Sequence, residues 1–170
     1  MRKNIFLMLA AGIFALTSCS DDDNNNNQND DDVVGTYRLA AVTAPGEQDL
    51  NEDGVASADL TTEYDCYSDW EIVLHANHTF TRTFNVVSAV DGELNCQMSQ
   101  TASGTWERNG QTLVMTNTDG DGELTDTFTF SADDQILTQT GPGEFPTIFE
   151  NIFIMEPGTL TTVYTRVGDE

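Results

Sequence analysis

The chain has 170 residues, of which 29 are acidic and 6 are basic, and its formal net charge is −23. This charge excludes nucleic acids and anionic membrane surfaces as partners, because clusters of Lys and Arg supply the affinity for both. It favours cations as ligands, and the chain is long enough to bury a full core without a cofactor.

The N-terminal residues have the organisation of a secretory signal. Arg2 and Lys3 precede an apolar run from Ile5 to Leu16, which is too short to span a bilayer as a mature helix. The run ends in Leu16-Thr17-Ser18-Cys19, which looks like a lipobox, where a signal peptidase leaves an acylated cysteine as the new N-terminus. We therefore expect residues 1–18 to be a lipoprotein signal peptide and Cys19 to attach the protein to outer-membrane lipid.

The segment from Ser20 to Asp32 contains only Ser, Asp, Asn and Gln. Without apolar residues it cannot bury surface, so we expect residues 19–32 to be a lipidated, disordered and self-repelling tether. Its start, Ser20-Asp21-Asp22-Asp23, resembles the export signal of lipoproteins that Bacteroidetes carry to the cell surface. A spacer without a sorting role is the alternative. We expect the following domain to face the cell exterior.

From Val33 onward, segments rich in Val, Thr, Phe and Tyr alternate in polarity between turn residues, as is typical of β-strands. We expect strands at residues 34–43, 70–75, 79–87, 98–107, 111–117, 124–131, 136–140, 148–155 and 160–167. We expect turns at Asp91-Gly92, Asn109-Gly110, Asp119-Gly120-Asp121-Gly122 and Glu156-Pro157-Gly158. The pattern predicts an all-β domain over residues 33–170, an up-and-down antiparallel β-barrel of about eight strands, with a flattened β-sandwich as the alternative.

Cys66 and Cys96 are the cysteines that remain after Cys19. An exported chain meets an oxidising compartment, so we expect a structural disulfide between them. Two free thiols or a metal pair is the alternative, but no His or Cys stands at ligand spacing to complete a metal site.

Several short motifs resemble, in their order and spacing, the lipocalin-like domains of Bacteroidetes lipoproteins. They are Gly35-Thr36-Tyr37-Arg38-Leu39, Asn77-His78-Thr79-Phe80, Gly104-Thr105-Trp106 and Val163-Tyr164-Thr165-Arg166. In true lipocalins the first strand carries Gly-x-Trp, and here Tyr37 stands at the Trp position. The resemblance implies a lipocalin-like β-barrel and small apolar ligands.

Residues 49–59 read D-x-N-x-D-G-x-x-S-x-D, which matches the first nine positions of an EF-hand-type calcium loop. We expect a structural Ca²⁺ ion held by Asp49, Asn51, Asp53, the Val55 carbonyl, Ser57 and Asp59. The bidentate acid of such loops belongs at position twelve, where Leu60 stands. The bidentate ligand would therefore be Asp59, one position early, or Glu63, if the chain folds back toward the ion. A metal-free Asp- and Gly-rich surface loop is the alternative.

No Gly-x-Ser-x-Gly elbow, phosphate loop, zincin helix or reactive-cysteine context is present in the sequence, so we do not expect an enzyme. We expect a lipid-anchored binding module for a small apolar or glycan ligand. The alternative is a structural or interaction lipoprotein with a fully packed barrel. The two differ in whether aromatic side chains enclose a cavity or interdigitate, and the candidate ligand-binding residues are Tyr37, Trp70, Phe84 and Phe128.

Overall fold

The computed structural model describes residues 30–118 and 124–168. The signal segment, Cys19, the tether up to Asn29 and the expected turn at Asp119 to Gly122 lie outside the described residues. The described strands and short 3-10 helices are η1 (Asp30–Val33), β1 (Gly35–Gln48), β2 (Ser57–Asp59), η2 (Asp65–Tyr67), β3 (Glu71–Leu74), β4 (Thr79–Val90), β5 (Glu93–Asn109), β6 (Thr112–Asn117), β7 (Leu124–Phe130), β8 (Ile136–Phe149) and β9 (Ile152–Val167). Neither of these helices has the length and apolar content that a bilayer crossing requires.

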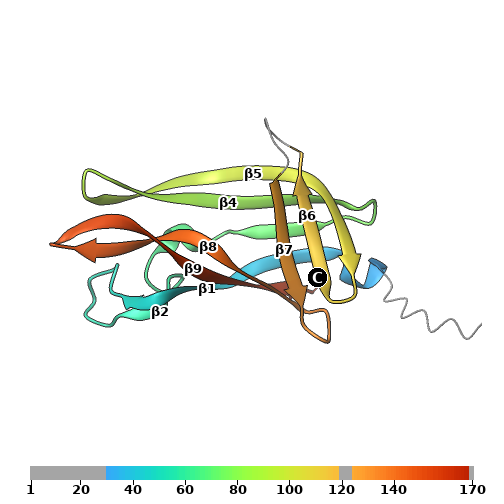
Figure 1. Ribbon diagram of the computed structural model, residues 1–170, viewed down its shortest axis with the longest axis horizontal. Coiled ribbons are helices and arrows are strands. Elements are labelled where there is room, and N and C mark those ends of the chain that lie inside the picture. Colours follow the sequence, from blue (N-terminus) through green and yellow to red (C-terminus); the bar gives the residue numbers. More distant parts are fainter. Residues whose placement is uncertain (1–29, 119–123, 169–170) are drawn as a thin grey trace, which may run out of the picture.

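The strands form one antiparallel sheet in the order β2-β1-β3-β4-β5-β6-β7-β8-β9, and β1 also pairs with β9 (Figure 1). The second pairing closes β1 and β3 to β9 into an eight-stranded up-and-down barrel, with the short β2 added to the edge of β1. The predicted all-β barrel is therefore confirmed, and the flattened sandwich is not.

Two hairpins, β4–β5 and β8–β9, have strands longer than β6 and β7 and extend beyond them (Figure 1). The β8–β9 hairpin turns at Glu150 and Asn151, whose φ angles of 50° and 66° match the turn type that suits the twist of paired strands. The predicted turn at Glu156-Pro157-Gly158, between separate strands, is wrong. Pro157 pairs with Glu144 inside β9, where β9 has no second neighbour, so the missing N–H of proline leaves no ladder bond unmade.

The barrel interior next to η1 is filled by interdigitating side chains. Val33, Tyr37, Ile72, Trp106, Phe128 and Tyr164 belong to this main core cluster, and all are at most 1% exposed. Leu113 and Met115 of β6 share one strand face, as do Phe128 and Phe130 of β7, and all four side chains are buried. A bulge between Leu39 and Ala41 shifts β1 by one residue. It lets Tyr37 and Val42 both point inward.

One end of the barrel is closed by η1. Val33 is fully buried in the main core, and the Tyr37 hydroxyl donates to the Val33 carbonyl over 2.9 Å. From β9, Arg166 donates to the carbonyls of Asp32 and Val34, each over 2.6 Å. The described chain therefore enters the fold at the closed end, and the long hairpins extend from the opposite end (Figure 1).

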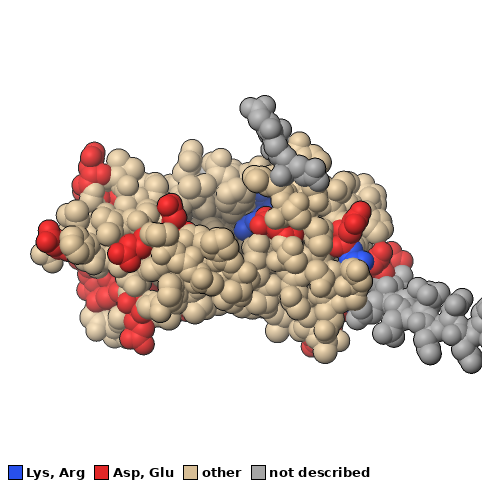
Figure 2. All heavy atoms as spheres, viewed as in Figure 1, with Lys and Arg blue, Asp and Glu red and all other residues tan. Residues whose placement is uncertain are grey.

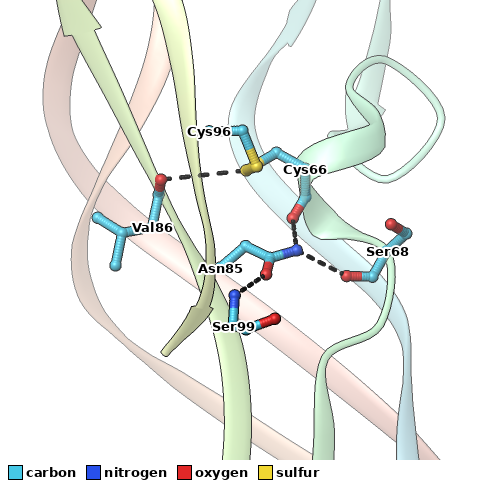
Figure 3. Close-up of a disulfide and its surroundings, with 6 residues drawn as sticks. All are labelled: Cys66, Ser68, Asn85, Val86, Cys96 and Ser99. Carbon is cyan, nitrogen blue, oxygen red and sulfur yellow. Dashed lines mark hydrogen bonds between the residues drawn. A yellow bond between two sulfur atoms is a disulfide. The ribbon is translucent and has the colours of Figure 1, made fainter. Parts of the chain in front are cut away.

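The predicted disulfide between Cys66 and Cys96 is confirmed, with 5.6 Å between the Cα atoms. It joins η2 to β5 beside Asn85, a side chain of β4 that is 4% exposed (Figure 3). The Asn85 amide donates to the carbonyls of Cys66 and Ser68 over 2.9 Å and 3.1 Å, and accepts from the Ser99 N–H over 2.8 Å. The segment around η2 is thus fixed against the β4–β5 hairpin.

Candidate functional site

A cavity of about 330 Å³ lies at the end of the barrel opposite η1, between β4 and the extended part of β8 and β9. We call it the mouth cavity. Its apolar wall includes Tyr67, Trp70, Phe84, Met155 and Leu160. Tyr67 and Trp70 reach this position because the disulfide and Asn85 hold their segment against β4.

Three aromatic rings form a continuous row along one side of the mouth cavity. The ring centroids of Tyr67 and Trp70 are 5.5 Å apart, and Trp70 meets Phe84 edge to face at 6.2 Å. Arg82 extends the row, since its guanidinium carbon lies 5.5 Å from the Phe84 centroid. The indole N–H of Trp70 is buried and has no hydrogen-bond partner in the described chain. The row therefore combines apolar surface with an unused donor.

Of the four aromatic residues proposed from the sequence, Trp70 and Phe84 line this cavity and contact each other. Tyr37 and Phe128 do not line it, because both are fully buried in the main core. Burial raises the pKa of Tyr37 to about 12. These two side chains therefore belong to the packed part of the barrel interior and not to the cavity.

A second cavity, of about 430 Å³, opens through the barrel wall between β7 and β8. We call it the seam cavity. The backbones of β7 and β8 pair only at Thr129 with Thr138 and at Phe130 with Leu137, so the strands diverge beyond this point. Figure 2 shows a hollow on this face, with a few basic atoms beside acidic ones. Side chains bridge the gap, since the Gln139 amide donates to Asp126 Oδ1 over 2.8 Å.

Arg82 is the centre of a polar network at the seam. Its Nη1 donates to Asp126 Oδ2 over 3.2 Å, and its Nη2 donates to the Tyr164 hydroxyl over 3.4 Å. Burial raises the pKa of Tyr164, and the neighbouring Arg82 charge opposes that shift. Arg82 Nε and the Thr162 hydroxyl are buried without a hydrogen-bond partner in the described part of the chain. The site therefore has hydrogen-bonding capacity that the protein itself does not use.

Sequence reasoning did not single out Arg82 or Asp126, although the sequence contains the signal. Arg82 stands between Phe80 and Phe84 at a spacing of two, and Asp126 precedes Phe128 at the same spacing. In a strand, residues at this spacing share a face. A charged residue on an apolar, inward-facing stripe indicates a polar group inside the barrel.

The expected calcium loop coils through hydrogen bonds to its own backbone. Asp49 Oδ2 accepts from the Gly54 N–H over 3.1 Å, Asn51 Oδ1 from Asp53 over 3.0 Å, and Asp53 Oδ1 from Val55 over 2.8 Å. The other oxygen of Asp49, Oδ1, is buried and has no partner among the described residues. The first half of the loop thus offers one uncommitted carboxylate oxygen.

The second half of the loop is used to attach β2. Asp59 Oδ1 accepts from the N–H of Val42 and from the N–H and hydroxyl of Thr61, and the Ser57 hydroxyl accepts from the Asp59 N–H. Glu63 folds back instead, 5% exposed, and accepts from the Leu50 N–H over 3.2 Å. In the described ranges, no three Asp, Glu, His or Cys side chains are gathered closely enough to hold a metal ion.

Comparison with known protein families gives one match. The model of the lipocalin-like domain matches residues 33–138, which run from the end of η1 into the start of β8 and include Trp70, Arg82, Phe84 and Asp126. No curated protein and no solved structure matches the chain. The match covers more than half of the chain, and β9 completes the barrel outside it. The chain therefore belongs to the family of lipocalin-like domains.

Proposed function

We propose that the protein is a lipid-anchored, surface-exposed binding module that takes a small ligand, apolar or glycan, into the mouth cavity. The observation that carries this proposal is the row formed by Tyr67, Trp70 and Phe84 along a cavity of about 330 Å³. Small-molecule sites are mostly apolar concavities of this size class with a few polar groups. Lipocalin-like proteins are generally binding or carrier proteins, so we propose binding rather than catalysis.

A structural or interaction protein with a fully packed barrel is the alternative. The interdigitated core around Tyr37 and Phe128 is what this alternative requires. The mouth cavity favours the binding module, because the side chains of that core do not fill it. Exposed apolar side chains at the hairpin tips, Val90, Ile148, Phe149 and Ile152, would be the contact surface under the alternative.

Binding can be tested with Nile red, an uncharged dye whose emission shifts to the blue in apolar surroundings. We expect saturable binding to the protein, and its loss in Met155→Trp, which places a large ring in the cavity wall. Ile148→Trp adds the same ring to the adjacent strand β8 at an exposed position, and should leave binding unchanged. No saturable Nile red signal, or equal binding in both variants, would contradict a ligand in the mouth cavity.

The lipid anchor rests on the signal-like start and the Leu16-Thr17-Ser18-Cys19 motif. In a Bacteroidetes host, we expect the full chain to incorporate an alkyne analogue of palmitate and to be cleaved by protease added to intact cells. Cys19→Ala should abolish labelling and release the protein from membranes, whereas Ser18→Ala should not. Labelling of Cys19→Ala would contradict the anchor. Labelled protein that resists external protease would contradict surface exposure.

We propose in addition that residues 49–63 bind Ca²⁺, with Asp49, Asn51, Asp53, the Val55 carbonyl and Ser57 as ligands. Support comes from the buried, unpartnered Asp49 Oδ1 and from the hard oxygen donors that Ca²⁺ prefers. Glu63 is better placed than Asp59 to complete the set, since three donors already occupy Asp59 Oδ1.

Calcium binding is tested by thermal unfolding with excess Ca²⁺ and with a chelator. An ion that binds only the folded state must raise the midpoint temperature of unfolding. Asp49→Asn should remove that rise. Asp91→Asn, in the β4–β5 turn, is the control for a lost surface charge. The same midpoint with Ca²⁺ and with chelator would rule the site out.

A further inference from the structure

The mouth cavity and the seam cavity share part of their walls. Arg82, Leu160 and Thr162 line both of them. These three side chains therefore lie between the mouth cavity and the seam cavity, and the two cavities are adjacent.

The mouth end and the seam end of this pair of cavities differ in chemistry. The mouth end presents the rings of Trp70 and Phe84 together with Met155, which offer apolar contact. The seam end presents the carboxylate of Asp126, the amide of Gln139 and several threonine hydroxyls. An occupant of both ends must itself have an apolar part and a polar part.

We propose that the two adjacent cavities together bind an uncharged amphipathic molecule, with its hydrocarbon part along Trp70 and Phe84 and its oxygen-bearing head group at Arg82 and Thr162. This inference rests on the proposed function, because it names the class of ligand that the mouth cavity takes. It adds the seam between β7 and β8 as the recognition site for the head group.

Unused hydrogen-bonding atoms support the position of the head group. Arg82 Nε and the Thr162 hydroxyl are both buried and unpartnered within the described chain, and both residues line the two cavities. A buried donor without an acceptor destabilises the unliganded protein, and a ligand oxygen relieves that cost. Because the two atoms are covered, binding is accompanied by a small side-chain rotation that turns them toward the ligand.

The charges around the seam select an uncharged head group. The two oxygens of Asp126 already accept from Arg82 and Gln139, so no free carboxylate remains there for an ammonium group. A carboxylate head group would meet Asp126 at the seam and Glu144 in the mouth wall, on a chain of net charge −23. Hydroxyl and ester oxygens can accept hydrogen bonds from Arg82 and Thr162. They need no free carboxylate, and Asp126 and Glu144 do not repel them.

The test compares three ligands that share an eight-carbon chain and differ in the head group. They are 1-octanoylglycerol, octanoate and octylammonium, titrated calorimetrically below their micellar concentrations into the full chain carrying Cys19→Ser, which cannot be acylated at Cys19. We expect 1-octanoylglycerol to bind at least tenfold more tightly than either charged ligand. Equal affinities for the three, or preference for a charged one, would overturn the inference.

Thr162→Val tests the role of the head-group site while preserving side-chain shape. We expect it to weaken 1-octanoylglycerol about tenfold and to weaken octanoate and octylammonium far less, so that the preference for the uncharged head group is lost. Thr165→Val, at an exposed position of the same strand, is the matched control. Unchanged 1-octanoylglycerol affinity in Thr162→Val overturns the head-group site alone, provided that Nile red still binds. Failure of Nile red to bind the unsubstituted barrel overturns the proposed function as well.

Discussion

The guanidinium of Arg82 and the carboxylate of Asp126 meet 3.2 Å apart across the barrel, although β4 and β7 are not neighbours in the sheet. Their side chains are 17% and 43% exposed, so the pair lies between a surface contact and a buried one. Through this contact one wall of the mouth cavity is tied to the strand at which the barrel opens.

A double-mutant cycle with Arg82→Gln and Asp126→Asn should therefore show a coupling free energy of about 1 kcal/mol, the upper end of the range for partly exposed pairs. The measurement is urea unfolding of the four proteins. Arg38 and Glu71 form a matched control pair at 3.3 Å with the more exposed guanidinium, 68%. Their coupling should stay below about 0.5 kcal/mol. Equal coupling free energies in both cycles would mean that partial burial at the seam does not strengthen the ion pair between Arg82 and Asp126.

Gly104 lies where β5 approaches β6 and β4 too closely for any side chain. A Cβ atom there would stand 1.9 Å from the Thr116 carbonyl oxygen and 2.9 Å from the Phe80 ring. We expect Gly104→Ala to lower the free energy of unfolding by about 3 kcal/mol, since backbone must move. Gly141→Ala in β8 meets no atom within 4 Å and should change stability by less than about 0.5 kcal/mol. A Gly104→Ala protein as stable as Gly141→Ala would contradict the packing at this position.

Removal of the disulfide should affect both stability and binding. The bridge closes a loop with a sequence separation of 30, so the chain-entropy argument predicts a loss of about 3–4 kcal/mol in Cys66→Ala/Cys96→Ala. Nile red should also bind more weakly, because Tyr67 and Trp70 follow Cys66 closely in the chain. Chemical denaturation of the oxidised protein, the reduced protein and the double variant measures the effect. Reduced and doubly substituted proteins should agree, and an unchanged midpoint in both would show that the bridge is not stabilising.

Alkaline pH should destabilise the fold through its buried tyrosines. Burial raises the pKa of Tyr37 from 10.0 to about 12, and it also raises the pKa values of Tyr67 and Tyr164. Below pH 10 these groups are neutral in both the folded and the unfolded chain and add no pH dependence. Between about pH 10 and pH 12 the unfolded chain ionises first, so the free energy of unfolding falls as the pH rises.

Urea unfolding at pH 8, 10 and 11 measures this decline. Tyr37→Phe removes the hydroxyl that donates to Val33, and should cost about 1 kcal/mol at pH 8. Above pH 10 its stability should decline less steeply than that of the unsubstituted protein. An equally steep decline would assign the pH dependence to other groups.

The sequence predicted most of the strands and two of the hairpins, for local reasons. The strand expected at residues 148–155 is wrong, because it runs across the turn between β8 and β9. Asp91-Gly92 and Asn109-Gly110 each place glycine where φ is positive, at 82° and 61°, so the turn chemistry is visible in the residue types. Glu150 and Asn151 also form a turn with positive φ angles, but glutamate is not a residue type that indicates such a turn. The turn was predicted at Pro157 instead, because proline is common in turns. Pro157 fits in β9 because β9 is paired only with β8 at this residue. The pairing between β1 and β9 covers Thr161 to Val167 and does not reach Pro157.

The candidate site was less predictable than the strands, because membership of the site depends on where an inward-facing residue lies along the barrel axis. Tyr37, Trp70, Phe84 and Phe128 all belong to inward-facing stripes, and period-two alternation cannot separate core positions from cavity positions. That separation arises from the bulge in β1, the divergence of β7 from β8 and the position of η2, none of which has a local sequence signal. Arg82 and Asp126 were missed for a related reason, since charged residues on a strand are ordinarily assigned to the solvent face.

The described chain enters the barrel through η1, at the end that Val33 and Arg166 keep shut. Under the proposed anchoring at Cys19, this shut end is the one that a short stretch of chain links to the bilayer. The opening beside Trp70 lies at the other end of the barrel from that attachment. Anchoring through Cys19 would therefore leave the opening free to take up molecules from the surrounding medium.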